Sequence, residues 1–327
     1  MQDLLKKMIK LDGPISMSRY MQLCLTHPEH GYYNRERVFG IKGDFVTAPH
    51  ISQLFGEMCA IWCLTKYKQK PYSLVELGPG NGQLMSDMLN VFKQFPDLQP
   101  KEIHFVEKSL TLKKQLKEKF PAAKFHSTVF ELNIDNPIII ANEFFDALPV
   151  MQFKRVDKEW KEIRINFNND FELCHTDVKA SKILEYLSSR FKSIAHDIVE
   201  VSPETWDTSK KIGELLKSGG SALIMDYGYT RPRGSTFRAI KDHKFVDFLS
   251  KPGERDLTYD VDFEAIRKWS QCKSVILKTQ KDFLLSHGIE ARLDQMCLKN
   301  PEHAQSLRKD VEKLLTMENY HAMELEA

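Results

Sequence analysis

The feature that most constrains this chain is a short apolar segment that ends in an acid and runs into three alternate glycines. Residues 75–82 read VELGPGNG, and residues 83–95 continue with apolar side chains at helical spacing. Glycine is needed where the backbone takes a positive φ or where a ligand must approach it closely. A strand, a glycine loop and a helix in this order are typical of the ligand-binding edge of an α/β fold.

Short apolar runs alternate with helical patterns from residue 71 onward, which predicts βαβ units and a mostly parallel sheet. Helices are expected over residues 83–95 and 110–120. The expected strands cover residues 73–77, 103–107, 124–127, 138–141 and 221–226. The predicted fold class is therefore α/β.

The segment before the glycine loop has a different sequence pattern from the residues of the predicted sheet. Residues 1–70 are predicted to be helical over 3–11, 16–26 and 51–67, with a polar loop before the last helix. They are expected to cap the sheet rather than to form one. Residues 71–150 are then expected to form the half of the core that binds a ligand at the glycine loop.

The second half of the chain contains an insertion. Residues 151–220 are predicted to form antiparallel strands over 151–156 and 159–167 and a helix over 178–191. Such an excursion usually lies above the carboxyl edge of a parallel sheet, so it is a candidate substrate platform. Residues 221–327 complete the core, and residues 301–327 are expected to form a charged terminal helix.

Composition excludes several partners and sites. The 47 basic and 45 acidic residues give a net charge of +2, so no global field favours nucleic acid or an anionic membrane. No run approaches the roughly 18 apolar residues of a membrane span, and a cytoplasmic protein is expected. The six cysteines lack the paired spacing of zinc sites, and no fourth ligand accompanies His27, His30 and His50, so no metal site is expected.

The strand expected over residues 103–107 also ends in an acid, Glu107. A carboxylate there can accept hydrogen bonds from both ribose hydroxyls of a nucleoside. A dinucleotide fingerprint would need glycine where the chain has Gln83, so an NAD oxidoreductase is disfavoured. The glycine spacing suits an adenosyl amino acid instead. Glu76, at the end of the strand before the loop, can face the cationic amino group of such a ligand. The candidate binding residues of this loop are Glu76, Gly78, Gly80, Asn81 and Gly82.

Seven further motifs, several of them long and unusual in composition, accompany the glycine loop. They are GPIS at 13–16, HPEHGYY at 27–33, GDFVT at 43–47, ISQLFGE at 51–57, ANEFFDALP at 141–149, DYGY at 226–229 and DLTYDVDF at 256–263. With these motifs the chain resembles, over nearly its whole length, the MidA-type family of bacterial and mitochondrial methyltransferases. It departs from the family pattern at Asn81, where a basic or small residue often stands.

The resemblance implies a methyltransferase-type Rossmann-like fold with a helical N-terminal addition and a midchain insertion. It implies S-adenosyl-L-methionine as the cofactor. The mitochondrial member of the family methylates an arginine of a respiratory complex I subunit, so a protein arginine is the implied acceptor. A eukaryotic chain of this family would lie in the mitochondrial matrix after removal of its presequence. A bacterial member need not share the target.

An arginine acceptor is chemically demanding. The pKa of a guanidinium lies above about 12, so the group stays protonated at ordinary pH and has no nucleophilic lone pair. Paired carboxylates that accept hydrogen bonds from two of its nitrogens draw the positive charge toward themselves. They can also accept the proton that the methylated nitrogen loses. Glu143 and Asp146 follow the strand over 138–141 and are predicted to play this role, beside Phe144 and Phe145. The alternative is that the two acids cap a turn while the rings fill the core.

Other residues at the same edge complete the expected site. Asn142 is expected to bond to the donor or to the acceptor. Asp226 and Tyr227 end the next strand and are expected to form the other wall of the pocket, with an ordinary strand-ending turn as the alternative. Asp44 and Thr47 lie in a polar loop that either folds over the donor as a lid or merely joins two helices.

The leading hypothesis is a protein arginine methyltransferase that has a protein substrate as its partner, with a homodimer left open. The first alternative is a methyltransferase that acts on another protein residue or on a small molecule, since a fold does not determine a substrate. The second is a noncatalytic assembly factor that keeps the donor pocket. Glu76, Glu107 and the three glycines argue against the noncatalytic assembly factor, because an unused pocket has little reason to keep all of these residues in register.

Overall fold

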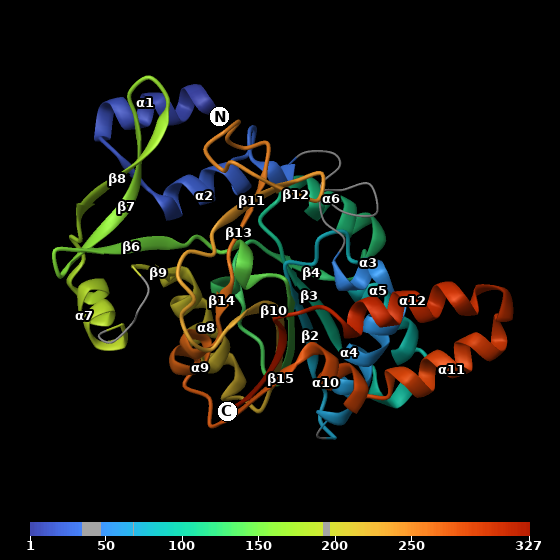
Figure 1. The fold of residues 1–327 in the computed structure, drawn as a ribbon. Helices are drawn as coiled ribbons and strands as arrows, with labels where there is room; N and C mark the ends of the chain where they lie inside the picture. Colours follow the sequence, from blue (N-terminus) through green and yellow to red (C-terminus); the bar gives the residue numbers. More distant parts are fainter. Residues whose placement is uncertain (35–46, 68, 192–196) are drawn as a thin grey trace.

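The structure is a computed structural model that describes residues 1–34, 47–67, 69–191 and 197–327. Its centre is an eight-stranded sheet (Figure 1). In spatial order its strands are β15 (Ser274–Thr279), β16 (Tyr320–Glu326), β10 (Ser221–Tyr229), β5 (Pro137–Asn142), β2 (Ser73–Leu77), β3 (Glu102–Val106) and β4 (Lys124–His126). A further short strand, β14 (Val261–Asp262), pairs with β10. The run from β10 to β4 is parallel, whereas β16 is antiparallel to both of its neighbours.

The middle strands are buried on both faces, which explains why their sequences read as continuous apolar runs. On β5, Ile138 and Ile140 belong to one core, and Ile139 and Ala141 belong to the core on the opposite face. The first core lies against α4 (Gln53–Thr65), α5 (Gln83–Phe92), α10 (Gln280–Ser286), α11 (Ile289–Lys299) and α12 (Ala304–Leu315), and the second against α8 (Pro203–Leu216) and α9 (Phe263–Ser270) (Figure 1). None of the described helices has the length and apolar content needed to span a bilayer.

A second, antiparallel sheet joins the insertion to the N-terminal segment. Its strands are β1 (Ile15–Ser16), β7 (Glu159–Phe167), β6 (Met151–Val156) and β9 (Ile198–Val201), with β8 (Phe171–Asp177) beside β7. The helices that pack near it are α1 (Gln2–Asp12), α2 (Met17–Thr26) and α7 (Ser181–Arg190). A third, small sheet contains β12 (Lys244–Val246), β11 (Arg238–Lys241) and β13 (Asp256–Thr258).

Most predicted elements are confirmed. The five predicted core strands are present, and the two strands of the insertion have the predicted bounds. The helix expected over residues 51–67 is two helices, α3 (Ala48–Ile51) and α4, because the Ser52 hydroxyl caps the second by accepting the Leu54 N–H at 3.3 Å. The expectation that the N-terminal segment forms no sheet is wrong at β1, and β8 lies outside the predicted strands.

The prediction of a terminal helix over residues 301–327 is wrong for the residues that follow α12, which ends at Leu315. The chain continues into β16, which lies inside the central sheet with Ala322 and Leu325 fully buried. This strand is hard to recognise in the sequence, because the charged residue Glu324 interrupts its apolar pattern. Glu324 is buried, but it accepts a hydrogen bond from Trp62 Nε1 at 2.9 Å.

The parallel strands bring several loops to one edge of the sheet. The carboxyl ends of β2, β3, β5 and β10 lie side by side there. Gly78, Glu107 and Glu143 directly follow the first three of these strands, and Asp226 lies in the last part of β10. The helix α6 (Leu110–Lys119) follows β3 at the same edge. The fold thus gathers residues that are far apart in the sequence.

Candidate functional site

The glycine loop links β2 to α5 with its three glycines in left-handed conformations. The φ angle is 65° at Gly78, 53° at Gly80 and 73° at Gly82. A Cβ atom on Gly78 would lie 2.9 Å from Cδ2 of Phe144, and one on Gly82 would lie 2.6 Å from Cε2 of Phe120. Side chains are therefore disfavoured in this loop, and its backbone stays open to a ligand.

Two cavities lie against the loop and share Gly78, Gly80 and Glu143 as lining residues. The large cavity is mostly apolar, whereas polar groups make up a larger share of the lining of the small cavity. The large cavity is further lined by Val106, Glu107, Leu112, Val129, Phe144 and Leu148, among others, and the small cavity by Thr47, His50, Glu76, Asn81 and Asn142, among others. The pair suits an elongated ligand with a flat apolar part and a small polar end.

Glu107 is the first residue after β3 and lies in the wall of the large cavity. Its Oε1 accepts a hydrogen bond from the Ser109 N–H at 2.7 Å, which fixes the carboxylate. Burial raises the pKa of Glu107 to about 7, and the Ser109 and Lys108 N–H groups oppose this rise. A carboxylate held in this position can accept hydrogen bonds from the two hydroxyls of a ribose.

Glu76 is a buried carboxylate in the wall of the small cavity. The residue is 3% exposed, and its Oε2 has no hydrogen-bond partner within the described part of the chain. Burial raises the pKa of Glu76 to about 8, although the Lys119 ammonium acts in the opposite direction. An unpartnered buried carboxylate is unfavourable until a cation or a donor reaches it. The small cavity therefore offers a place for a cationic group.

Thr47, His50 and Asn81 form a hydrogen-bonded bridge between α3 and the glycine loop. Asn81 Oδ1 accepts the Gln83 N–H at 3.1 Å, which fixes the orientation of the amide. Asn81 Nδ2 therefore donates to His50 Nε2 at 2.9 Å, and His50 Nδ1–H donates to Thr47 Oγ1 at 2.9 Å. Burial lowers the pKa of His50, in agreement with a neutral ring. His50 was not predicted as a site residue, because its role depends on contacts distant in sequence.

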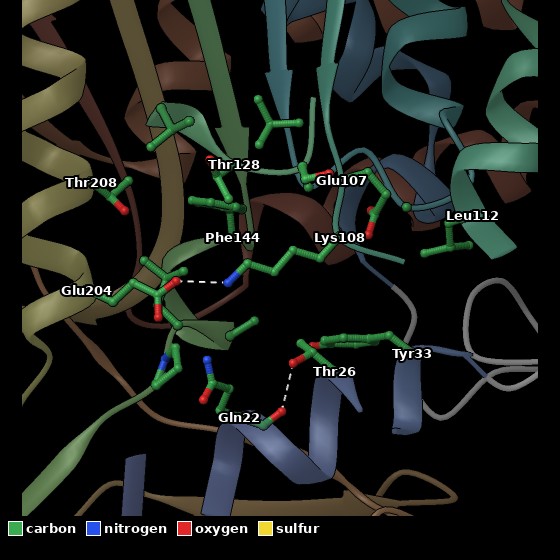
Figure 2. A pocket seen from close by; sticks show the side chains of 18 of the residues that line it. Gln22, Thr26, Tyr33, Glu107, Lys108, Leu112, Thr128, Phe144, Glu204 and Thr208 are labelled. Carbon is green, nitrogen blue, oxygen red and sulfur yellow. Dashed lines mark hydrogen bonds and ion pairs between the residues drawn. The ribbon is translucent and has the colours of Figure 1, made fainter. Parts of the chain in front are cut away.

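Side chains from distant segments cover the large cavity (Figure 2). Gln22 and Thr26 reach it from α2, and Tyr33 follows them along the chain. Lys108 Nζ, after β3, forms an ion pair of 2.9 Å with Glu204 Oε1 on α8 (Figure 2). Gln22, Thr26, Lys108 and Glu204 lie outside the motifs of the sequence, and Tyr33, the last residue of the motif at 27–33, was not predicted to line the site.

Glu143 follows β5 and lines both cavities. Its φ of 47° is unfavourable for a residue other than glycine, and its N–H donates to the Met225 carbonyl at 2.8 Å. The Ala48 N–H bonds to the carboxylate, but the buried Oε1 has no partner among the described residues. Burial and the nearby Asp146 raise the pKa of Glu143 to about 8. A strained backbone and an unpartnered carboxylate oxygen together indicate a functional position.

Asp146 forms an acid cluster with Glu143 and Asp226 where β5 and β10 end. Its Oδ2 accepts hydrogen bonds from Thr258 Oγ1, at 2.8 Å, and from the Tyr227 hydroxyl. Its Oδ1 is buried and has no partner in the described ranges. Burial raises the pKa of Asp146 in spite of the two hydrogen bonds.

Asp226 is fully buried and holds the turn after β5. Its Oδ2 accepts the N–H groups of Phe145, at 3.0 Å, and Asp146, at 3.3 Å, and its Oδ1 accepts the Tyr227 N–H at 3.0 Å. Burial, and then the Asp146 carboxylate, raise the pKa of Asp226 well above its ordinary value. Asp226 and Tyr227 are not among the residues that line the two cavities, and neither is Asp146. The structure places Asp226 and Tyr227 behind the wall, where they support Asp146.

The structure thus brings most predicted site residues together. Gly82 is the N-cap of α5, and Asp44 lies outside the described residues. Over the ranges that are described, no group of three or more His, Cys, Asp or Glu side chains is arranged to hold a metal ion. The predicted residues that line one or both cavities are Thr47, Glu76, Gly78, Gly80, Asn81, Glu107, Asn142 and Glu143.

The chain is similar to several known proteins. A family model described as "Putative S-adenosyl-L-methionine-dependent methyltransferase" matches residues 58–279. The mitochondrial protein arginine methyltransferase NDUFAF7 of Danio rerio is 34% identical over 88% of this chain and 76% of its own. The human protein of the same name is 33% identical over 90% and 74%. A Burkholderia thailandensis structure with bound S-adenosyl-homocysteine has a TM-score of 0.84 at 22% identity, covering 99% of this chain and 91% of its own, and supports the fold.

Proposed function

This chain belongs to the MidA-type family of S-adenosyl-L-methionine-dependent methyltransferases, and we propose that it methylates an arginine side chain of a protein. The donor and the class of reaction follow from membership of the family. The names of the relatives from Danio rerio and Homo sapiens, both protein arginine methyltransferases, support the arginine acceptor.

The two cavities fit this donor, which supplies a methyl group on a sulfonium. The large cavity has the apolar walls that an adenine base needs, and Glu107 in its wall can accept hydrogen bonds from the ribose hydroxyls. The small cavity has Glu76 Oε2, which lacks a partner, to face the cationic amino group. Gly78 and Gly80 lie between the two and leave room for close approach to the backbone.

The observation that carries the arginine assignment is a pair of unpartnered carboxylate oxygens next to the donor site. Glu143 Oε1 and Asp146 Oδ1 are buried and accept no hydrogen bond from a described residue. A guanidinium has donors for both oxygens, and its charge would lower the pKa values that burial raises. Both acids would then be ionised around a positive acceptor.

Ionised Glu143 can draw the guanidinium charge toward itself, which makes the free nitrogen more nucleophilic. It can also take the proton that this nitrogen must lose. Phe144 lies in the wall of the large cavity, where its ring can face a flat cation. The Tyr227 and Thr258 hydroxyls hold Asp146 in place for the same acceptor.

The family also suggests a location and a target. Relatives are mitochondrial proteins by name, and the proposed location is the mitochondrial matrix for a eukaryotic chain and the cytoplasm for a bacterial one. The resemblance to MidA-type proteins makes a respiratory complex I subunit the first candidate substrate.

Methyl transfer to proteins tests the proposed function. The protein is incubated with methyl-labelled S-adenosyl-L-methionine and an extract of its own source, and the labelled proteins are hydrolysed. Methylarginine is the expected product. Label in another amino acid, or only in small molecules, would support the alternative methyltransferases. Intact donor binding without any transfer would support the noncatalytic assembly factor.

Glu107→Gln is expected to weaken binding of S-adenosylhomocysteine by about 1.5 to 3 kcal/mol, roughly 10- to 150-fold, because the ribose loses charge-assisted hydrogen bonds. Calorimetric titration measures the change. Glu118→Gln, at an exposed position on α6, is the matched control and should bind normally. Equal affinities of the two variants would remove Glu107 from the donor site.

The donor-free protein is expected to lose stability as the pH rises from about 5 to 8, in part because of Glu76. Folded Glu76 keeps its proton up to about pH 8, whereas its ordinary pKa is 4.5. The folded state therefore holds more protons than the unfolded state in this interval, and its stability falls as the pH rises. Thermal unfolding of Glu76→Gln should show a smaller decline over the same interval. Parallel declines would contradict the assignment.

A further inference from the structure

A groove continues the site along the carboxyl edge of the central sheet. It lies where β10 and β15 end and where the antiparallel strand β16 begins, since Tyr227 pairs with Tyr320 and Thr279 pairs with His321. The large and small cavities lie at the same edge, over β2, β3 and β5. The groove and the donor cavities therefore flank the acid cluster along one edge.

The groove carries unpaired positive charge. Its lining includes the exposed side chains of Arg231, Arg233 and Lys281, and none of the three has a carboxylate partner in the described part of the chain. Arg233 NH2 donates to Asn319 Oδ1 at 2.9 Å, which orients its guanidinium. Among the described residues that line the groove, Glu318 is the one acid. With a net charge of only +2 on the whole chain, this concentration is a local feature.

Two aromatic rings separate the groove from the acid cluster. Tyr320 lines the groove, and its ring centroid lies 5.3 Å from that of Tyr227. The Tyr227 hydroxyl bonds to the Asp146 carboxylate. The sign of the charge thus reverses over a short distance, from acidic at the cluster to basic in the groove. A peptide whose arginine enters the cluster would place its neighbouring residues close to the groove.

We propose that this groove, the basic groove, binds acidic side chains that flank the target arginine in the protein substrate. The inference rests on the arginine methylation proposed above and specifies its substrate class. Arginine guanidinium groups pair with carboxylates through two parallel hydrogen bonds, and Lys281 adds a point charge. Leu315 and Met317 also line the groove and offer apolar contact to a peptide. These apolar residues and Glu318 favour a peptide over a phosphodiester backbone.

The recognition should be moderate in strength and sensitive to salt, because exposed ion pairs are weak and screened. Such a surface selects the substrate without contributing to the reaction itself. Reversal of its charge should therefore raise KM for an acidic substrate and leave kcat unchanged.

Peptide binding tests the proposal. Fluorescein-labelled peptides with one arginine flanked by glutamates, or by glutamines as isosteric controls, are titrated with the protein saturated with S-adenosylhomocysteine. At low salt the glutamate peptide should bind about 10-fold more tightly. Arg231→Glu combined with Arg233→Glu should abolish this preference without changing donor affinity or the melting temperature.

The matched control reverses two charges at the opposite edge of the sheet. Lys70 and Lys101 are exposed and precede β2 and β3, so Lys70→Glu combined with Lys101→Glu should keep the preference for the glutamate peptide. Equal binding of the two peptides, or a preference that survives in the groove variant, would overturn the proposal. Displacement of the glutamate peptide by a single-stranded RNA oligonucleotide at equal affinity would also overturn it, in favour of a nucleic-acid surface.

Failure of the basic groove is distinguishable from failure of arginine methylation. If arginine is methylated with no preference for acidic flanks, the groove assignment is wrong and the activity stands. If the groove variant loses the glutamate preference while no arginine is methylated by the unaltered protein, the acidic-peptide site stands and the proposed function fails.

Discussion

Glu143→Gln is expected to bind S-adenosyl-L-methionine as tightly as the unaltered protein and to transfer methyl groups about 100-fold more slowly or worse. The amide keeps the shape of the side chain but removes its charge and its capacity to accept a proton. Glu143 Oε1 has no partner in the described structure, and the hydrogen bond that the Ala48 N–H donates to the carboxylate can go to the amide oxygen of the glutamine instead. The melting temperature should therefore not fall. Calorimetry and single-turnover transfer rates measure the two quantities on one preparation.

The two readouts separate the roles that Glu143 can have, because it lines both cavities. If donor affinity falls in proportion to the rate, Glu143 belongs to the donor site and not to the acceptor site. If the rate is unchanged, the acid has no part in the reaction and the case for an arginine acceptor is lost. Glu118→Gln, on the exposed face of α6, controls for the loss of one negative charge.

Gly80→Val is expected to abolish measurable donor binding while the chain still folds. Gly80 lines both cavities and has a φ of 53°, so a branched side chain there both strains the loop and takes space that the donor needs. Thermal unfolding and calorimetric titration of the same sample check the two halves of the expectation.

Gly288→Val is the matched control for backbone strain. Gly288 has a φ of 88°, and apart from its neighbours in the chain no described residue has an atom within 4 Å of where its Cβ would be. Both variants carry the cost of a left-handed side-chain residue, about 1 to 2 kcal/mol, but only Gly80→Val should lose the donor. Normal donor binding by Gly80→Val would show that the donor does not lie against the glycine loop.

The donor half of the site is predictable from the sequence because it rests on local signals. Glu76 and the glycines follow one another on a single strand, loop and helix, and Glu107 ends the next predicted strand. The parallel sheet then places these segments side by side without further information. The structure adds the burial that raises the pKa values of Glu76 and Glu107.

The cover of the large cavity could not be predicted in this way. Lys108 and Glu204 pair across a long sequence separation, and Tyr33 reaches the cavity from the N-terminal segment. Lysine and glutamate at such positions usually read as ordinary surface residues, and the motif that contains Tyr33 does not show which cavity the side chain reaches. Only the three-dimensional arrangement of α2, α8 and the loop after β3 shows that they cover a ligand site.

The strand β16 was missed because a buried acid interrupts its apolar pattern. Glu324 forms ion pairs with Lys66 and Lys278, each with an N–O distance of 3.1 Å, and Trp62 also donates to it. Its partners come from helix and strand segments elsewhere in the chain. An acid in a charged terminal segment indicates a solvated helix unless these partners are known.

Asp226 illustrates why residue type and position at a strand end do not settle a role. The sequence places it at the same edge as Glu143, and an acid there suits either a pocket wall or a turn. Both of its oxygens accept backbone N–H groups in the structure, whereas Glu143 Oε1 accepts none from the described residues. The direction of the side chain distinguishes the two acids.

The most direct test of this account is a crystal structure of the protein with bound S-adenosylhomocysteine, the donor without its methyl group. We expect the adenosine in the large cavity with its ribose hydroxyls on Glu107, the amino group facing Glu76, and the sulfur atom on the side of Glu143. A ligand outside the two cavities, or a sulfur atom that faces away from Glu143, would contradict the account.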